Sequence, residues 1–520
     1  MRPLLLAAAA AALMVAGLAG AAKAEPLRSC ESLKSLDLSG VADKPGRIDA
    51  AGQAEFLGHK VCEVSGTIDP QVKFRLRLPL DGWSGRYVQT GCGGLCGHIS
   101  DEVAQVNGCA PWENVTLAIA TTDMGHEGPG PMFGDDPQLR VDFAHRGVHV
   151  TALASKAIVA AFYGRPAEHS YFVGCSDGGR EGLMSAQRYP ADFDGVAAGA
   201  PAYNFQIQNT FYHAWNARSN TGADGKPVLL AADLPILHRA ALKACHAEDG
   251  VIADPRRCAF DPKEADCAAG ETEGCLSPAK VEAARKIYEG PRTADGTWLT
   301  IGGPQPGSEL SWAGVFVPKP GSDEIFGRII ADGTIKFIAF DPNPPKDFGV
   351  DQLGFDEATF DKLKPMHVLY DATNPDISAF VGRGGRLLLW HGWSDPHISP
   401  LNTIAYYRAV RAALGQEAAD DAVRLFLIPG LYHCQGGEGF TKTDVLTPLI
   451  AWVEQGAAPA ALVLSGDGGS RPVFPYPAIA AYDGKGDRSA AASWGPTTPA
   501  DEPALRRWIG EGFLLAPAEK

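Results

Sequence analysis

The sequence predicts an α/β fold built on a mainly parallel sheet. Strand-like apolar runs alternate with helical patterns in the first 200 and the last 145 residues, and polar or glycine-rich segments follow directly after several of these runs. The chain has 520 residues. This length is too great for one simple core, so we expect about two domains, or one domain with a large insertion.

The first 24 residues have the features of a secretory signal peptide. Arg2 gives a positive start, an Ala/Leu-rich run follows, and Ala22-Lys-Ala24 is a small-x-small exit. The alternative is a membrane anchor, but the exit favours cleavage after Ala24. We therefore expect a periplasmic or extracellular protein with no membrane partner after cleavage. The net charge of −15 argues against nucleic acid as a partner.

Residues 25–202 are predicted to form the first part of the core. Residues 25 to about 70 have a mixed pattern, and strands are then expected at 72–78, 87–90 and 117–122. A helix is expected over 148–163, followed by a strand at 171–173. A second helix begins shortly after that strand and stops at Pro190.

Between that strand and the second helix stands Gly174-Cys-Ser-Asp-Gly178. A G-x-S-x-G segment between a strand and a helix is typical of a nucleophile elbow, which would expose the hydroxyl of Ser176 at the sheet edge. Because the chain has 60 glycines, an ordinary glycine-rich turn is the alternative.

Residues 203–375 are predicted to be an inserted domain, because the strand–helix alternation stops and Pro/Gly-rich turns recur. The chain has eleven cysteines, which in an exported protein should form disulfides and leave at least one thiol over. We expect the bridges Cys30–Cys62, Cys245–Cys258 and Cys267–Cys275. The partners of Cys92, Cys96 and Cys109 stay open.

Residues 376–520 are predicted to complete the core. Strands at 386–390 and 424–428 precede Asp395 and His433, with helices at about 401–414 and 446–454. Active groups in such sheets lie beyond the carboxyl ends of strands. The order Ser176, Asp395, His433 is the one that the α/β-hydrolase arrangement uses for nucleophile, acid and base. Each residue alone could be a turn or loop residue.

Two further features would support acyl transfer. The backbone N–H groups of Asp177 and of Gly93, in the loop Gly91–Gly94, are candidate oxyanion donors, although that loop could be a plain tight turn. Cys175 precedes Ser176 and Cys434 follows His433. A disulfide between these cysteines would hold serine and histidine within reach of each other, or would only staple two distant loops.

Five segments resemble the tannase/feruloyl esterase family of secreted serine esterases, which includes enzymes that hydrolyse mono(hydroxyethyl) terephthalate. They are Gly174-Cys-Ser-Asp-Gly-Gly-Arg180, Ala186–Pro190, Asp192–Pro201, His391-Gly-Trp-Ser-Asp395 and Pro429-Gly-Leu-Tyr-His-Cys-Gln-Gly-Gly437. The resemblance implies an α/β-hydrolase core with an inserted lid, and a small aromatic ester as substrate. An acyltransferase, a peptidase or a non-catalytic binding protein could use the same scaffold.

Calcium binding in the lid is another family feature, and this chain departs from it. The segment Cys245-His-Ala-Glu-Asp-Gly-Val-Ile-Ala-Asp254 is shorter than the family stretch and has His246 in place of the first aspartate. Asp249 and the Val251 carbonyl remain candidate ligands for a structural calcium ion, but calcium prefers six to eight oxygens. We therefore expect no required cofactor.

Three large side chains near these motifs need an interpretation. Arg180 and Arg188 lie on the expected elbow helix, where structural ion pairs are expected rather than substrate contacts. Trp393 stands two residues before Asp395 and could pack near the site or only fill the core.

Overall fold

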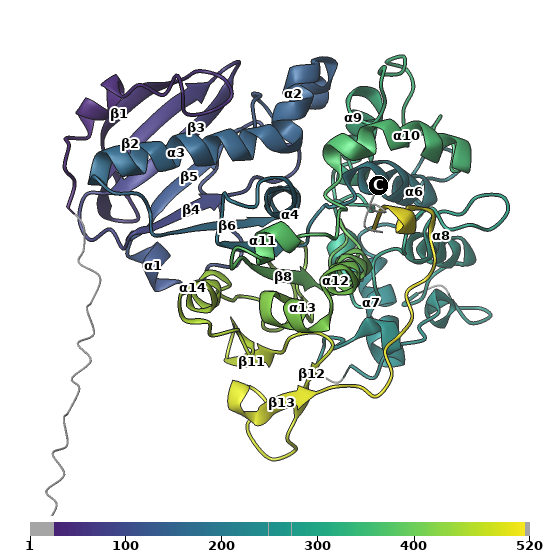
Figure 1. Ribbon diagram of the computed structural model, residues 1–520. Coiled ribbons are helices and arrows are strands. Elements are labelled where there is room, and N and C mark those ends of the chain that lie inside the picture. The colour runs from purple at the N-terminus through teal and green to yellow at the C-terminus, as the bar shows by residue number, and fades with distance from the viewer. Residues whose placement is uncertain (1–24, 248, 272, 515–520) are drawn as a thin grey trace, which may run out of the picture.

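A nine-stranded mixed sheet forms the centre of the molecule (Figure 1). The computed structural model describes residues 25–247, 249–271 and 273–514, so the expected signal peptide lies outside the described residues. The strand order is β1-β2-β3-β5-β4-β6-β7-β8-β9. The strands are β1 (Gly46–Phe56), β2 (His59–Ile68), β3 (Val72–Pro79), β4 (Arg86–Thr90), β5 (Ala118–Thr122), β6 (His169–Cys175), β7 (Gly195–Gly199), β8 (Arg386–Gly392) and β9 (Val423–Ile428).

The α/β prediction is confirmed, with a larger antiparallel part than expected. Strands β4 to β9 pair in parallel, whereas β1, β2 and β3 pair antiparallel and β3 joins β5 antiparallel. The hairpin of β1 and β2 was not expected. The sequence of this edge strand has almost no apolar alternation, because only one residue of β1, Ile48, needs to be buried.

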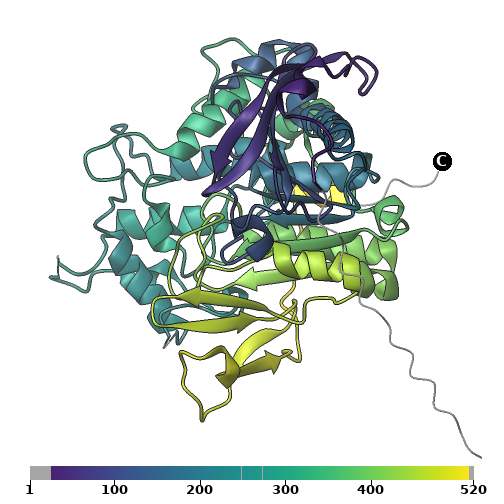
Figure 2. The ribbon, with the colours of Figure 1, turned by 90° about the vertical axis from the view of Figure 1, so that its left-hand side faces the viewer.

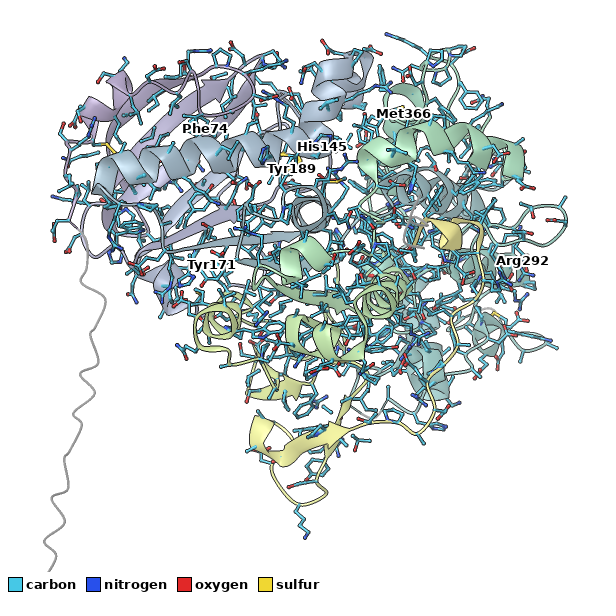
Figure 3. All side chains as sticks on the ribbon, viewed as in Figure 1. Phe74, His145, Tyr171, Tyr189, Arg292 and Met366 are labelled. Carbon is cyan, nitrogen blue, oxygen red and sulfur yellow. A yellow bond between two sulfur atoms is a disulfide. The ribbon has the colours of Figure 1, made fainter. Side chains whose placement is uncertain are left out.

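Helices cover both faces of the sheet. On one face lie α3 (Gly147–Tyr163), α4 (Asp177–Arg188) and α12 (Pro400–Leu414), and on the other lie α1 (Ala110–Glu113) and α14 (Leu446–Gln455). Successive residues of β6 divide between these faces: Phe172 joins the first core and Tyr171, labelled in Figure 3, joins the second. No helix in the described part of the chain is long and apolar enough to cross a bilayer.

Between β7 and β8 the chain leaves the sheet and forms a mainly helical region, seen in teal and green on the right of Figure 1. Part of this region has its own core around Leu237, Ile287 and Trp312. Its α-helices are α5 (Phe205–Ile207), α6 (His213–Ser219), α7 (Leu234–Ala244), α8 (Pro278–Glu289), α9 (Phe326–Phe337), α10 (Glu357–Tyr370) and α11 (Ser378–Val381). We call residues 203–375 the lid, and these limits stay a prediction.

The last part of the chain contains two small hairpins that the sequence did not predict. They are β10 (Leu462–Gly466) with β11 (Gly469–Val473), and β12 (Ile479–Tyr482) with β13 (Trp494–Thr497). Figure 2 shows them beneath the main sheet. The short helix α13 (Gln416–Ala422) leads into β9.

Five disulfides are formed among the described residues. The three expected bridges and the hypothesised Cys175–Cys434 bridge are present, and Cys92–Cys96 is the fifth, a pairing that the sequence had left open. Cys109 is the cysteine left over, and it is buried. The odd count had required one such thiol.

Candidate active site

Ser176 lies in a sharp turn between β6 and α4. Its φ of 65° and ψ of −120° are in a region that side chains rarely adopt, which is the geometry of a nucleophile elbow. Close packing explains the two flanking glycines. A Cβ on Gly174 would lie 2.6 Å from the Gly178 carbonyl oxygen, and one on Gly178 would lie 2.9 Å from the Cys92 carbonyl oxygen.

Asp395 and His433 meet beyond the ends of β8 and β9. His433 Nδ1 lies 2.7 Å from Asp395 Oδ2, and Asp395 is fully buried. The other carboxylate oxygen accepts hydrogen bonds from the backbone N–H groups of His397 and Ile398. Although burial alone would raise the pKa of Asp395, His433 and His391 hold it well below its ordinary value. Asp395 is therefore a carboxylate at neutral pH.

His391 is a second partner of Asp395 that the sequence analysis quoted in a motif without giving it a role. Its Nε2 lies 3.1 Å from both Asp395 Oδ2 and the Ile398 carbonyl oxygen, and its Nδ1 lies 2.7 Å from Thr403 Oγ1. Because both neighbours of Nε2 are acceptors, Nε2 carries the proton. His391 thus helps to orient the Asp395 carboxylate by donating to Oδ2, the same oxygen that His433 contacts.

The disulfide between Cys175 and Cys434 joins the elbow to the histidine loop. The two Cα atoms are 5.9 Å apart, although 259 positions separate the residues in the sequence. Ser176 and His433 consequently line the same pocket. Among the described residues no hydrogen bond joins their side chains, and bonds of this kind are often long until a substrate binds.

The loop after β4 is fixed to the start of α4. The Cys92 carbonyl oxygen accepts a hydrogen bond of 2.7 Å from the Gly178 N–H, and the Cys92 N–H donates to Glu181 Oε1 at 3.2 Å. Cys92 and Cys96 form a disulfide around Gly93 and Gly94, both of which line the pocket. This arrangement places the backbone of Gly93 on the same pocket as Asp177.

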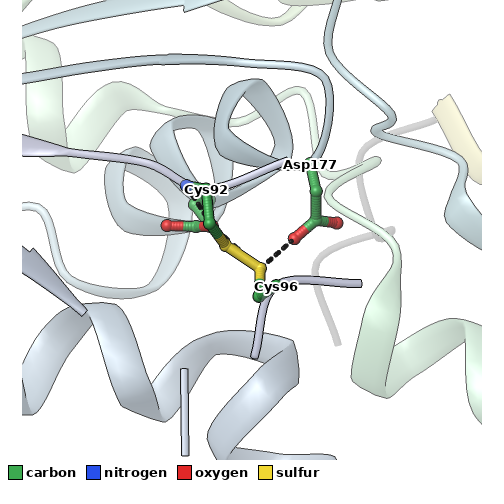
Figure 4. Close-up of side chains that lie close together, drawn as sticks. Cys92, Cys96 and Asp177 are labelled. Carbon is green, nitrogen blue, oxygen red and sulfur yellow. Dashed lines mark hydrogen bonds between the residues drawn. A yellow bond between two sulfur atoms is a disulfide. The ribbon is translucent and has the colours of Figure 1, made fainter. Parts of the chain in front are cut away.

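Two buried carboxyl groups lie beneath this loop. Asp177 Oδ2 is 3.4 Å from Cys96 Sγ (Figure 4), and Asp177 pairs with Arg180 at 2.6 Å. Burial and the neighbouring Asp177 raise the pKa of Glu181 well above its ordinary value. The carboxyls and the two sulfurs are close enough to surround a cation, but the disulfide leaves no thiolate to bind one.

The pocket above Ser176 has a volume of about 300 Å³. The lid supplies much of its wall, including side chains for which the sequence contained no motif. His213 comes from the lid, whereas His397 comes from the loop after β8. Burial and the nearby His433 lower the pKa of His213 to about 3 and the pKa of His397 well below its ordinary value, so both rings are uncharged at neutral pH. The lining residues are Gly93, Gly94, Cys175, Ser176, Asp177, Ala202, Phe205, Gln208, Asn209, His213, Phe326, Ile330, His397, Ile398, His433, Cys434 and Gln435.

The three large side chains near the motifs lie outside this pocket lining. Arg180 is fully buried in its ion pair with Asp177, as expected. The prediction of an ion pair for Arg188 is wrong. Within the described residues, its guanidinium group donates hydrogen bonds to the Val368 carbonyl and the Met184 sulfur and faces no carboxylate. Trp393 is buried and fills the core, with the guanidinium carbon of Arg256 5.4 Å from the centroid of its ring.

The candidate calcium residues do not fit the ion. Asp249 accepts a hydrogen bond of 2.7 Å from Arg488, and Arg471 lies 3.5 Å from its other carboxylate oxygen. The charge on Asp249 is therefore already balanced by guanidinium groups from the C-terminal hairpins. Val251 lies beside Asp249 in the wall of a cavity dominated by apolar side chains rather than oxygens.

Comparisons with known proteins agree with this geometry. The sequence model described as tannase and feruloyl esterase matches residues 54–495. The chain is 34% identical to a mono(2-hydroxyethyl) terephthalate hydrolase from Piscinibacter sakaiensis, over 84% of this chain and 85% of that one. It is 32% identical to a probable feruloyl esterase from Arthroderma benhamiae, over 84% and 85%. The crystal structure of feruloyl esterase B from Aspergillus oryzae shares the fold, with a TM-score of 0.77 at 24% identity over 90% of this chain and 100% of that one.

Proposed function

The chain belongs to the tannase and feruloyl esterase family and is a carboxylic ester hydrolase for aromatic esters, and on this premise we propose that Ser176 is the nucleophile that carries the acyl group. The observation that supports the proposal most directly is the convergence of the strained Ser176 turn and the Asp395–His433 pair on one pocket. The disulfide of Cys175 and Cys434 holds that arrangement.

The chemistry follows from which nitrogen of His433 is engaged. Nδ1 faces Asp395, so Nε2 is left to accept the Ser176 proton. The serine oxygen then attacks the ester carbonyl, and the backbone N–H groups of Asp177 and Gly93 stabilise the oxyanion. His433 returns the proton to the departing alcohol, leaving the acyl-enzyme. Water then attacks the acyl-enzyme by the same steps, with His433 as the general base, and the aromatic acid is released from Ser176.

The pocket favours an aromatic acyl group without a charge of its own. Phe205, Phe326 and Ile330 give apolar walls, and Gln208 and Asn209 add neutral polar groups. Among the lining residues that the structure describes, no lysine or arginine is present. A second carboxylate, as in a terephthalate monoester, would therefore be desolvated without a cationic partner, which costs more than the roughly 1–3 kcal/mol of burying an unpaired neutral polar group. Hydroxylated benzoate and cinnamate esters avoid this cost.

We also propose that the enzyme is exported and needs no metal ion. The predicted signal peptide and the five disulfides favour an oxidising compartment. The triad and the backbone donors supply every group that ester hydrolysis requires.

Labelling with a serine-directed phosphonate tests the nucleophile. Wild-type enzyme and a Ser32→Ala control, whose exposed serine lies far along the chain from the elbow, should be labelled and active, whereas Ser176→Ala should be neither. Undiminished labelling or activity of Ser176→Ala would refute the assignment.

A substrate panel tests the acyl specificity. Ferulate and hydroxybenzoate esters should exceed a terephthalate monoester in kcat/KM by at least about tenfold, because burying an unpaired carboxylate costs more than burying a neutral polar group. A preference for the monoester would contradict the proposed pocket chemistry. Adding alcohol acceptors to the same assays would reveal transferase activity through new ester products.

A further inference from the structure

A buried histidine joins the lid to the loop that carries His433. His238, on α7 of the lid, lies 2.7 Å through Nδ1 from Glu309 and 3.2 Å through Nε2 from Glu438. The exposed fractions of the three side chains are 7% for His238, 0% for Glu309 and 26% for Glu438. Because each ring nitrogen faces a carboxylate, both nitrogens must donate, and His238 is an imidazolium.

Glu309 connects this histidine to the loop after β8 that carries Asp395, which we call the acid loop. Its carboxylate also accepts hydrogen bonds from the Gly307 N–H at 2.8 Å and from the hydroxyl of Tyr288. On either side of Glu309, the Gly307 carbonyl accepts a bond from the Ser394 hydroxyl at 2.9 Å, and Ser311 donates to the Ser394 carbonyl at 3.0 Å. Ser394 immediately precedes Asp395, so the Glu309 segment contacts the loop that presents the acid.

Glu438 connects the same histidine to the loop after β9 that carries His433, which we call the base loop. Its backbone N–H donates to the Gly430 carbonyl at 2.9 Å, and Leu431 pairs with Gly437. These bonds close the loop that carries His433 and Cys434. The Glu438 carboxylate therefore lies next to the backbone hydrogen bonds that close the loop carrying His433.

We propose that His238, as an imidazolium between Glu309 and Glu438, is a positioning residue that fixes the lid against the loops carrying Asp395 and His433. Its effect on catalysis rests on the proposed function, whereas the ion triad itself does not. Loss of its proton would leave two carboxylates facing one remaining donor, and the lid would lose a charged link to both loops.

Proton loss is expected only at alkaline pH. Burial alone would lower the pKa of His238, but the hydrogen bonds with Glu309 and Glu438 outweigh it and raise the pKa to about 9. The other titratable groups around these carboxylates are Tyr288 of α8 and Tyr432 of the base loop. Burial raises the pKa of both, so neither hydroxyl ionises in the same range.

The triad can be tested without relying on activity. Histidine labelled with ¹⁵N in the full-length protein should show one ring, absent in His238→Gln, that titrates near pH 9. In Glu438→Gln, which keeps the size of a half-buried side chain but removes its charge, that titration should fall by about one pH unit. The proposal would be overturned if the His238 ring titrated near pH 6.5, or if its titration midpoint were the same in Glu438→Gln as in the wild type.

The pH dependence of turnover tests the positioning role. For a neutral aromatic ester, kcat of the wild type should fall above pH 9 while KM changes little, and Glu438→Gln should show the same fall about one pH unit earlier. Glu438→Asp, which restores the charge, should return the profile toward the wild type. Glu324→Gln, at an exposed lid glutamate, should match the wild type. An unmoved profile in Glu438→Gln would refute positioning, even if the ring titration is as expected.

Discussion

Removing the Cys175–Cys434 disulfide should separate positioning from stability. In the double variant Cys175→Ala/Cys434→Ala, the elbow and the His433 loop lose the disulfide that links them across 259 positions of the sequence. In the chain-entropy description, a loop of this length contributes at most about 5.5 kcal/mol to the free energy of unfolding. The unfolding entropy of a protein of this size is about 1 kcal/mol per degree, so Tm should fall by only about 5 °C.

The effect on turnover should be larger than this modest change in Tm suggests. The disulfide holds the Cα atoms of the two cysteines 5.9 Å apart, and each is the chain neighbour of a reacting residue. A displacement of about 1 Å between nucleophile and base costs about a hundredfold in rate, or about 2.7 kcal/mol in the barrier. We therefore expect kcat at 25 °C to fall about a hundredfold while the protein remains folded.

A second disulfide provides the matched control. Cys30 and Cys62 lie 32 positions apart and tie the start of the chain to β2, away from the pocket lining. Their removal should cost about 3.7 kcal/mol by the same description but leave kcat within about twofold of the wild type. Steady-state kinetics with an aromatic ester, together with thermal unfolding, would measure both effects. Equal kcat values in the two double variants would refute the positioning argument.

Three further predictions concern the acid, the lid and pH. Asp395→Asn removes the carboxylate that fixes the His433 tautomer, so kcat should fall about ten-thousandfold, whereas Asp361→Asn on the exposed side of α10 should not change it. EDTA should leave Tm and kcat unchanged, because Arg488 already balances Asp249; a chelator-induced fall in Tm that calcium reverses would contradict this reading. The stabilisation from His238, whose folded pKa is raised, is fully present below about pH 6.5 and is lost as the pH rises through about 9. Tm should therefore fall over this window by more in the wild type than in Glu438→Gln, and equal falls in both proteins would count against the ion triad.

The sequence alone determined the local features of the site. A glycine-flanked serine between a strand and a helix requires a sharp turn, because only glycine permits the close contact of Gly178 with Cys92. The strands ending before Asp395 and His433 were visible as apolar runs, and parallel strands present their carboxyl ends at one edge. Local pattern and strand direction therefore sufficed to bring three distant residues together.

Only the tertiary structure decided what surrounds them. His213 and Phe326 enter the pocket from the lid, through packing between segments that share no periodic pattern. Arg488 reaches Asp249 across 239 positions, and His238 links Glu309 to Glu438 across the lid. Such contacts depend on where whole elements dock. Docking is set by the sum of many weak packing contacts over the chain, so no short motif encodes it.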